Sequence, residues 1–211
     1  MPRRPLILLQ RLENTHEGLS YEMTLFVDFL FSGGNFKMDK KMWEKCVEFH
    51  GHECPGLAIG FKACELAIKN LGLEFSKDEE LVCVTENDAC GVDAVQVLCG
   101  CSFGKGNLIY RDRGKQAFSF FKRNTGQSAR FVLKNMPRSG DKEQRKNQLL
   151  NTPSEELFDV KTPEYELPER ARIFNSIICE KCKERTAENK IRISDGKNVC
   201  LDCFSNYTRG W

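Results

Sequence analysis

The chain has 211 residues, 40% of them hydrophobic and 29% charged, a balance typical of a soluble folded protein with one ordinary domain and a small appendage. A formal net charge of +2 excludes a chain-wide electrostatic footprint for nucleic acid. The apolar run at residues 23–31 carries Asp28 and is about half as long as a bilayer span, so no membrane association is expected.

Cysteine usage indicates the compartment. The chain holds eleven cysteines, an odd number, and the aliphatic run at its amino terminus stops at Gln10, which is too short for a secretory leader. We therefore expect a reducing cytoplasm, in which thiols serve as metal ligands or reactive groups rather than as a disulfide framework.

The first predicted helices come after an unpatterned segment. Residues 1–37 share no clear pattern with the rest of the chain, whereas Met38 opens an amphipathic stretch; we expect 1–37 to be an extension and Met38 to start the functional protein. A second predicted helix begins at Gly56, carries apolar residues at three- and four-residue steps, and is ended by Gly72. Cys64 lies in that apolar stripe, which favours packing over chemistry.

The rest of the core mixes short strands and helices. Strands are predicted over 81–86, 107–112, 117–122 and 129–134, and helices over 92–99, 142–150 and 154–158. This pattern predicts an α+β fold with a mixed helix and antiparallel-sheet core over residues 38–160. A polar linker at 161–172 then leads to a small unit at 173–211.

One candidate site lies at the start of the second helix. The run His-Gly-His-Glu-Cys-Pro-Gly at residues 50–56 places two imidazoles and the Cys54 thiol at a helix mouth, where backbone amides favour a thiolate. Such groups are suitable ligands for a soft or borderline transition metal. A structural role for His50 stays open, whereas His52 and Cys54 are interpreted as functional.

A polar stripe follows the first buried strand. Cys90, Asp93 and Gln96 recur every three residues and so share one face of the predicted helix at 92–99. Polar side chains on a segment between core strands need hydrogen-bonding or ligand partners, because burying them unpaired is costly. This favours a binding site over a solvated surface.

A glycine-rich turn at residues 100–107 contributes Cys101, Lys105 and Asn107. It could cradle an anion, but it lacks the spacing of a phosphate-binding loop. Cys46, Cys83 and Cys99 are interpreted as packing residues.

The strongest motif lies near the carboxyl end, where Cys179 and Cys182 are followed, after seventeen residues, by Cys200 and Cys203. Two such knuckles can place four thiolates around one zinc ion, as in a zinc ribbon or treble-clef-like unit. Two disulfides or redox dithiols are the alternatives, but residues 173–211 are too few to bury a sufficient core without a metal. A short hairpin turning at Asp195-Gly196 is predicted between the knuckles.

Three motifs together, at residues 50–56, 87–96 and 100–108, closely resemble the FmdE family, which is named after the E subunit of formylmethanofuran dehydrogenase. The resemblance covers roughly residues 40–134, and the four-cysteine finger matches the longer family members. It implies an α+β core, frequent dimerisation, a metal- or thiol-bearing cavity, and association with operons for molybdenum- or tungsten-dependent formylmethanofuran dehydrogenase. It implies no catalytic activity of its own, because the molybdopterin-bearing and formyl-transferring parts of that enzyme belong to other subunits.

The first functional hypothesis is a metal-handling accessory factor or a small metalloenzyme. In this hypothesis the core holds a second transition metal through His52, Cys54 and one or both of Cys90 and Cys101. Asp93 would act as the acceptor that fixes the His52 tautomer. These groups are expected to converge on one cavity, because all lie at the ends of elements that pack together.

Further roles follow from the same hypothesis. The candidate catalytic residues are Cys54, Cys101 and Lys105. The candidate residues for orienting ligands or a small anionic substrate are Asp93, Gln96 and Asn107.

The second hypothesis is a binding module, in which the finger engages a protein or nucleic acid and the core senses a ligand or metal. The finger is locally basic, which leaves nucleic acid open as a partner. A homodimer and contact with oxidoreductase subunits are the other expected associations.

Overall fold

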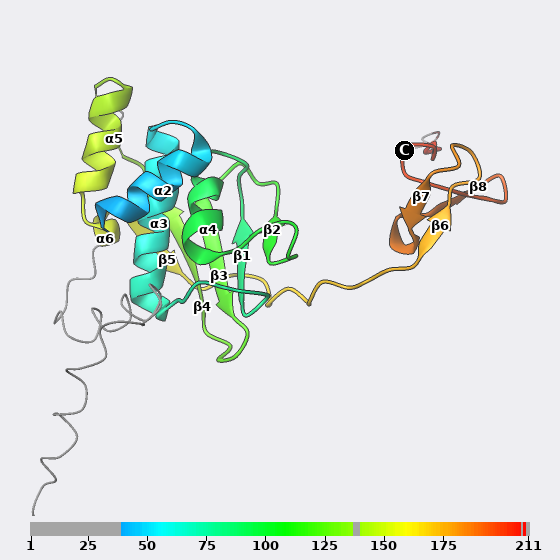
Figure 1. Cartoon of the computed structure of the whole chain (residues 1–211), viewed down its shortest axis with the longest axis horizontal. Helices are drawn as coiled ribbons and strands as arrows, with labels where there is room; N and C mark the ends of the chain where they lie inside the picture. Colours follow the sequence, from blue (N-terminus) through cyan, green and yellow to red (C-terminus); the bar gives the residue numbers. More distant parts are fainter. Residues whose placement is uncertain (1–38, 137–139, 208, 210–211) are drawn as a thin grey trace, which may run out of the picture. The chain divides into compact units, whose positions relative to one another are not determined.

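The computed structural model describes residues 39–136, 140–207 and 209, so the expected extension 1–37 and the expected start at Met38 lie outside the described part. Its contacts divide the chain into two units, one ending at Arg170 and one beginning at Ala171. Figure 1 gives the labels of the helices and strands in both units.

Capping residues explain where the core helices begin and end. Helix α2 (Lys40–His50) begins at Asp39, whose side chain accepts a hydrogen bond of 2.9 Å from the Met42 amide, and ends at Gly51 with φ +89°. Helix α3 (Pro55–Leu71) starts with a proline, which needs no amide partner in the first turn. It ends at Gly72, which adopts the left-handed conformation expected of a terminating glycine.

Five strands form one sheet in the order β2-β1-β3-β4-β5. Their bounds are β1 (Leu81–Thr85), β2 (Leu108–Tyr110), β3 (Ala117–Lys122), β4 (Ser128–Leu133) and β5 (Phe158–Lys161). Only β1 and β2 pair in parallel, because helix α4 (Gly91–Cys99) carries the chain from one to the other as a crossover. The other pairs are antiparallel, so the predicted α+β class is confirmed.

The carboxyl-terminal part of the core differs from prediction at one strand. Helix α5 (Lys142–Asn151) is followed by the short helix α6 (Ser154–Leu157), and Phe158 then opens β5 instead of ending the helix. Phe158 is buried and pairs with Leu133, so the tertiary contact with β4 decides its conformation. A four-residue strand has too few positions for its periodicity to be recognised.

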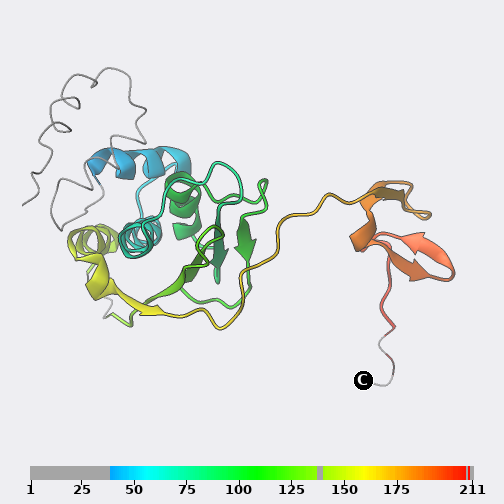
Figure 2. The same cartoon turned by 90° about the horizontal axis from the view of Figure 1, so that it is seen from below.

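The helices cover one face of the sheet (Figure 2). Residues Phe118, Phe120 and Phe131 point toward them and belong to the main core cluster. The opposite face carries Val82, Val84 and Phe121, which form a smaller cluster with the partly buried Ile109 and Tyr165. The alternation along each strand produces these two apolar faces.

The expected linker is partly attached to that second face. The Tyr165 hydroxyl donates to Ser119 Oγ at 2.8 Å, and the Arg123 guanidinium donates to the Pro168 carbonyl at 2.8 Å. Residues up to Arg170 therefore belong to the core unit.

The second unit contains two short hairpins. Strand β6 (Ser176–Ile178) pairs with β7 (Arg185–Ala187), and after the turn of 3₁₀ helix η1 (Glu188–Lys190), β8 (Arg192–Ser194) pairs with β9 (Lys197–Val199). Asp195 and Gly196 both have positive φ, +50° and +73°, as a two-residue hairpin turn of this hand requires. The predicted hairpin is thus confirmed.

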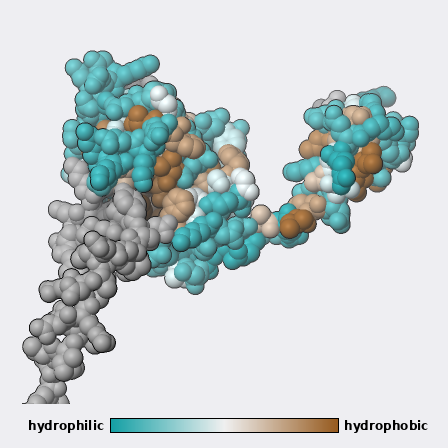
Figure 3. Space-filling model, viewed as in Figure 1, coloured by the Kyte–Doolittle hydropathy of each residue, from teal (hydrophilic) through white to brown (hydrophobic). Residues whose placement is uncertain are grey.

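The visible surface is mostly hydrophilic, with apolar side chains on both units (Figure 3). Phe49, Phe75 and Phe103 of the core and Ile178 and Ile193 of the finger are among the exposed large apolar residues. None of the helices in the described residues combines the length and apolarity of a membrane span.

Candidate metal centres

The second unit brings its four cysteines together. The sulfur atoms of Cys179, Cys182, Cys200 and Cys203 all lie within 4.8 Å of one another. The Cys200 amide donates to Cys179 Sγ at 3.3 Å. Backbone amides of Cys182 and Cys200 lower the pKa of the Cys179 thiol to about 6, because they stabilise the thiolate. Amides directed at sulfur are suited to a thiolate metal site.

The four crowded sulfurs favour a bound cation. The hydrogen bond between the Cys203 and Cys200 thiols is the largest cause that raises the pKa of Cys203 to about 12, and the negative charge of a Cys179 thiolate also raises it. A divalent ion removes that repulsion and allows all four thiols to ionise. The donor set and its geometry therefore fit a structural zinc ion.

The core contains a second cluster, formed by His50, Cys54 and Cys90. Their ligand atoms also lie within 4.8 Å of one another, and all three side chains are partly buried. His50 is the last residue of α2, Cys54 is the N-cap of α3 and Cys90 precedes the first residue of α4. Three helix ends therefore meet at this cluster.

The two thiols of the cluster are not equivalent. Cys54 Sγ accepts a hydrogen bond of 3.2 Å from the Leu57 amide and lies 3.8 Å from His50 Nε2. Cys90 makes no capping hydrogen bond to its helix. Burial is the largest cause that raises the pKa of Cys90. The hydrogen bond with Cys54 and the negative charge of a Cys54 thiolate raise it further. A bound cation would offset the cost of ionising both.

A carboxylate orients the imidazole. His50 Nδ1 lies 2.7 Å from Asp93 Oδ2, and Gln96 Nε2 donates to the other carboxylate oxygen at 3.0 Å. The His50 side chain is only 12% exposed, so this contact is shielded from water. When Nδ1–H donates to the carboxylate, Nε2 is left with its lone pair directed toward Cys54. The arrangement is that of a metal-ligating histidine with its orienting partner.

Three glycines allow the cluster to form. A Cβ on Gly56 would lie 3.1 Å from Cys90 Cβ, closer than such contacts ordinarily come, so Cys90 would have to shift to make room for a side chain here. A Cβ on Gly60 would lie 2.0 Å from the Gly91 carbonyl oxygen, which shows how closely α3 and α4 approach. That approach places Cys90 next to Cys54.

Residues 49–169 match the family model described as FmdE, molybdenum formylmethanofuran dehydrogenase operon. The chain belongs to the FmdE family. Residues 172–209 match a second model, the prokaryotic dksA/traR C4-type zinc finger. The predicted resemblance and the predicted four-cysteine finger are both confirmed.

Two relatives of the FmdE chain support this assignment. A probable S-adenosyl-L-methionine-binding protein of Archaeoglobus fulgidus is 32% identical over 196 residues, which cover 77% of this chain and 52% of the relative. The crystal structure of an FmdE-like protein of the tungsten formylmethanofuran dehydrogenase type from Syntrophus aciditrophicus aligns with a TM-score of 0.60 and 25% identity, covering 78% of this chain and 90% of that one. The chain spans about half the length of the curated relative, so that protein's name assigns no ligand here.

The cluster in the FmdE core contains a different histidine from the one that the sequence predicts. The predicted ligand and partner of Asp93 is His52, but His50 occupies both positions, while His52 is exposed with its ring centroid 4.5 Å from that of His50. The reason is Gly51, whose left-handed conformation reverses the chain directly after α2. His50 stays on the helix end that faces α4, and His52 turns outward.

Cys101 does not join the cluster, so the predicted convergence is wrong for this residue. The nine residues of α4 separate it from Cys90 by about 13 Å along the helix axis. Its thiol is fully buried and points to the Leu81 carbonyl oxygen at 3.7 Å. It packs in the main core with Cys46, Cys64, Cys83 and Cys99, and burial is among the causes that raise the pKa of each of these five thiols.

Lys105 and Asn107 lie at the same distant end of α4 as Cys101. Lys105 Nζ donates to the Ser76 carbonyl at 2.7 Å. The Asn107 amide donates to the carbonyls of Asp78 and Leu81 at 2.9 Å each. These contacts fix the glycine-rich loop against the segment before β1, at the end of α4 away from the cluster of His50, Cys54 and Cys90.

Sequence reasoning assigns no role to Glu53. Its carboxylate receives a hydrogen bond from Lys146 of α5 and lies 3.4 Å from Trp43 Nε1 of α2. Glu53 thereby anchors the loop between His50 and Cys54 to two helices. The position of Glu53 between His50 and Cys54 could have suggested a role. The role was not recognised because its partner Lys146 is far away in the sequence.

Proposed function

We propose that the FmdE core binds a transition metal ion through His50, Cys54 and Cys90, in addition to the zinc ion of the finger. The observation that carries the proposal is the cluster itself, three soft or borderline donors within 4.8 Å with the imidazole oriented by Asp93. One imidazole and two thiolates suit Zn²⁺ and other borderline divalent metals.

The number of ligands distinguishes the two metal sites. The finger supplies four thiolates, which complete a tetrahedral zinc site and leave no position for another ligand. The core cluster supplies three side chains, so a four-coordinate ion there keeps one position open for water or a small ligand. The core is therefore the site at which chemistry or metal transfer would take place.

The biological role that we propose is that of an accessory or metal-handling factor for an oxidoreductase related to formylmethanofuran dehydrogenase. Its support is the family match over residues 49–169 and the similarity to an FmdE-like protein of known structure. The partners would be oxidoreductase subunits, with the FmdE protein itself acting as a homodimer in the cytoplasm.

His50 and His52, which stand two residues apart, provide a matched pair of variants for testing metal binding by the core. We expect the full chain, loaded with zinc and passed over a desalting column, to retain two ions per chain by elemental mass spectrometry. His50→Gln should retain one, because removing one of three ligands costs most of the affinity. His52→Gln should retain two.

Loading with Co²⁺ gives a second readout of the same variants. The intense thiolate-to-cobalt absorption comes from both sites. Cys54→Ser, Cys90→Ser and His50→Gln should each lose the share of this absorption that comes from the core site and keep the share from the finger. A wild-type chain with a single tightly held ion, or a loss of the core ion in His52→Gln but not in His50→Gln, would reject the site.

A regulatory binding module is the second candidate function. The observation that favours it is the match of residues 172–209 to the dksA/traR finger family, together with the closed coordination of that finger. The finger would then engage a protein or nucleic acid while the core senses a metal. Duplex DNA binding that weakens steeply with salt, and that disappears when the finger is disrupted, would favour this candidate.

A further inference from the structure

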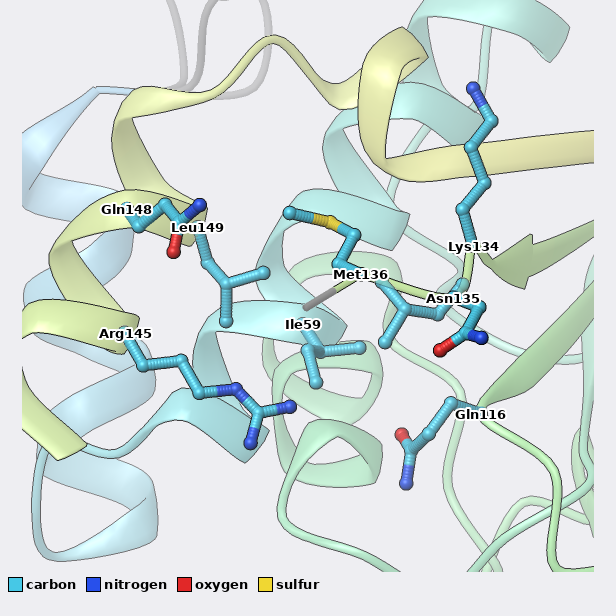
Figure 4. A pocket seen from close by; sticks show the side chains of 9 residues that line it. Ile59, Gln116, Lys134, Asn135, Met136, Arg145, Gln148 and Leu149 are labelled. Atoms are coloured by element: carbon cyan, nitrogen blue, oxygen red, sulfur yellow. The ribbon is translucent and has the colours of Figure 1, made fainter. Parts of the chain in front are cut away.

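The FmdE core holds a cavity of about 400 Å³ between α3, α5 and the strands β3 and β4 (Figure 4). Its size falls within the range of small-molecule sites, roughly 300–1,000 Å³. It shares no residue with the cluster of His50, Cys54 and Cys90, so it constitutes a separate feature.

The walls of the cavity are partly aliphatic. Ile59 comes from α3, Leu133 ends β4, Met136 follows that strand and Leu149 comes from α5. In Figure 4 the side chains of Leu149, Met136 and Ile59 face the same space. This composition suits a short branched hydrocarbon group, which would lose contact with water on binding.

Arg145 supplies the charge that is directed into the cavity. The lining includes Arg145 and Lys134 and no acidic residue, but the Lys134 ammonium is turned away and donates to the Glu155 carbonyl at 3.1 Å. Glu53 and Glu143 each form an ion pair with Lys146. Within the described residues, no carboxylate forms an ion pair with Arg145. The Arg145 guanidinium extends into the space beside Ile59 in Figure 4. A planar guanidinium with this orientation is suited to bind a carboxylate through two parallel hydrogen bonds.

An unsatisfied acceptor lies in the wall of the cavity. Gln116 Oε1 is buried and is the one buried side-chain nitrogen or oxygen that lacks a hydrogen-bond partner within the described residues. Buried acceptors are almost always paired, so an unpaired one in a cavity wall indicates a missing donor. In Figure 4 the end groups of Arg145 and Gln116 both lie below Ile59, Arg145 to its left and Gln116 to its right.

We infer that this cavity binds a small aliphatic carboxylic acid that carries a hydroxyl or amino group beside its carboxylate. The carboxylate pairs with Arg145, the hydroxyl or amino group donates to Gln116 Oε1, and the aliphatic part contacts Ile59 and Leu149. The inference stands on these side chains alone and does not depend on metal binding by the core.

The test uses methyl NMR of the full chain, because Ile59, Leu133, Met136 and Leu149 supply reporter methyl groups in the walls. The probe is 2-hydroxy-4-methylpentanoate. Two matched probes each lack one recognised group: its methyl ester has no anion, and 4-methylpentanoate has no hydroxyl. We expect concentration-dependent shifts of the four reporters with the hydroxy acid and at least tenfold weaker binding of either matched probe.

Protein variants assign the contacts. Arg145→Gln should weaken binding of the hydroxy acid at least tenfold and remove its advantage over the ester. Arg113→Gln, a change at an arginine outside the cavity, should leave binding unchanged. Unperturbed spectra of both variants without ligand show that each is folded. The inference is overturned if the reporters do not shift up to the solubility limit of the hydroxy acid, if the ester or the deoxy acid binds equally well, or if the two variants behave alike.

Discussion

At the scale of single residues, Glu86 and Arg130 form a bidentate ion pair in the core. Arg130 Nε and Nη2 donate to the two carboxylate oxygens of Glu86 at 2.6 and 2.8 Å. The Glu86 side chain is 4% exposed, so the pair is shielded from solvent. The hydrogen bonds from Arg130 lower the pKa of Glu86, although burial acts in the opposite direction.

We predict that Glu86→Gln destabilises the core by about 3 kcal/mol at neutral pH, because it leaves a partly buried guanidinium without its counter-charge. A carboxyl whose pKa is lowered by folding contributes stability above its unfolded pKa of about 4.3, and this contribution is lost as the pH falls through the folded value. The wild type should therefore lose stability below about pH 4 more steeply than the variant. Urea unfolding across this range measures the difference.

Glu74→Gln serves as the control for this prediction, because Glu74 is exposed and lies outside the ion pair. It should leave both the stability at neutral pH and the acid dependence as they are in the wild type. Equal acid dependence in Glu86→Gln and the wild type would mean that the pair contributes nothing to folding.

At the scale of elements, the close approach of α3 and α4 determines the geometry of the cluster of His50, Cys54 and Cys90, which we propose as a metal site. A Cβ on Gly60 would come within 2.0 Å of the Gly91 carbonyl oxygen and 2.4 Å of its Cα. Backbone atoms cannot rotate away as a side chain can, so the two helices themselves would have to separate. Cys90 precedes α4 and would move with it.

We predict that Gly60→Ala destabilises the core by about 1–3 kcal/mol, as overpacking does, and also lowers metal occupancy of the core cluster. Gly104→Ala is the matched control, because a Cβ there meets nothing within 4 Å. Thermal unfolding and ion counting on the same samples report the two effects. A variant that unfolds earlier but keeps its core ion would show that the helix contact does not position Cys90.

At the scale of the whole molecule, the two units have separate cores. The larger unit is held together by a cluster of helix and sheet residues, whereas the finger buries only Cys179, Val199 and Cys200 among its described apolar residues, with partial cover from Cys203 and Phe204. So small a core cannot offset the entropy of ordering the finger. Its stability must come from zinc.

Cys179→Ser should therefore unfold the finger and leave the core intact, because a structural zinc ion supplies folding free energy of roughly 10 kcal/mol or more. We expect rapid proteolysis after about residue 171, the loss of one zinc ion per chain, and an unchanged unfolding transition of the core. Ser205→Ala, outside the ligand set, is the control. Unchanged protease resistance and zinc content in Cys179→Ser would refute the four-thiolate assignment.

The sequence by itself determined the features that depend on local spacing. The four finger ligands follow from two knuckles and a hairpin turn, and the end of α3 follows from Gly72. The sequence also identified four of the five strands of the core sheet, because they are short runs rich in apolar residues. Within the candidate site, Cys54 was identified because it stands at a predicted helix start, and Cys90 because it shares a polar face with Asp93 and Gln96.

Tertiary structure alone decided which groups meet. The choice of His50 over His52 depends on the direction in which Gly51 turns the chain, and the contact of Asp93 with His50 depends on how α4 lies against α2. Cys101 and Cys90 flank one helix in the sequence, but the length of that helix separates them in space. Spacing in sequence determines local geometry, whereas contacts between helices depend on how their surfaces pack.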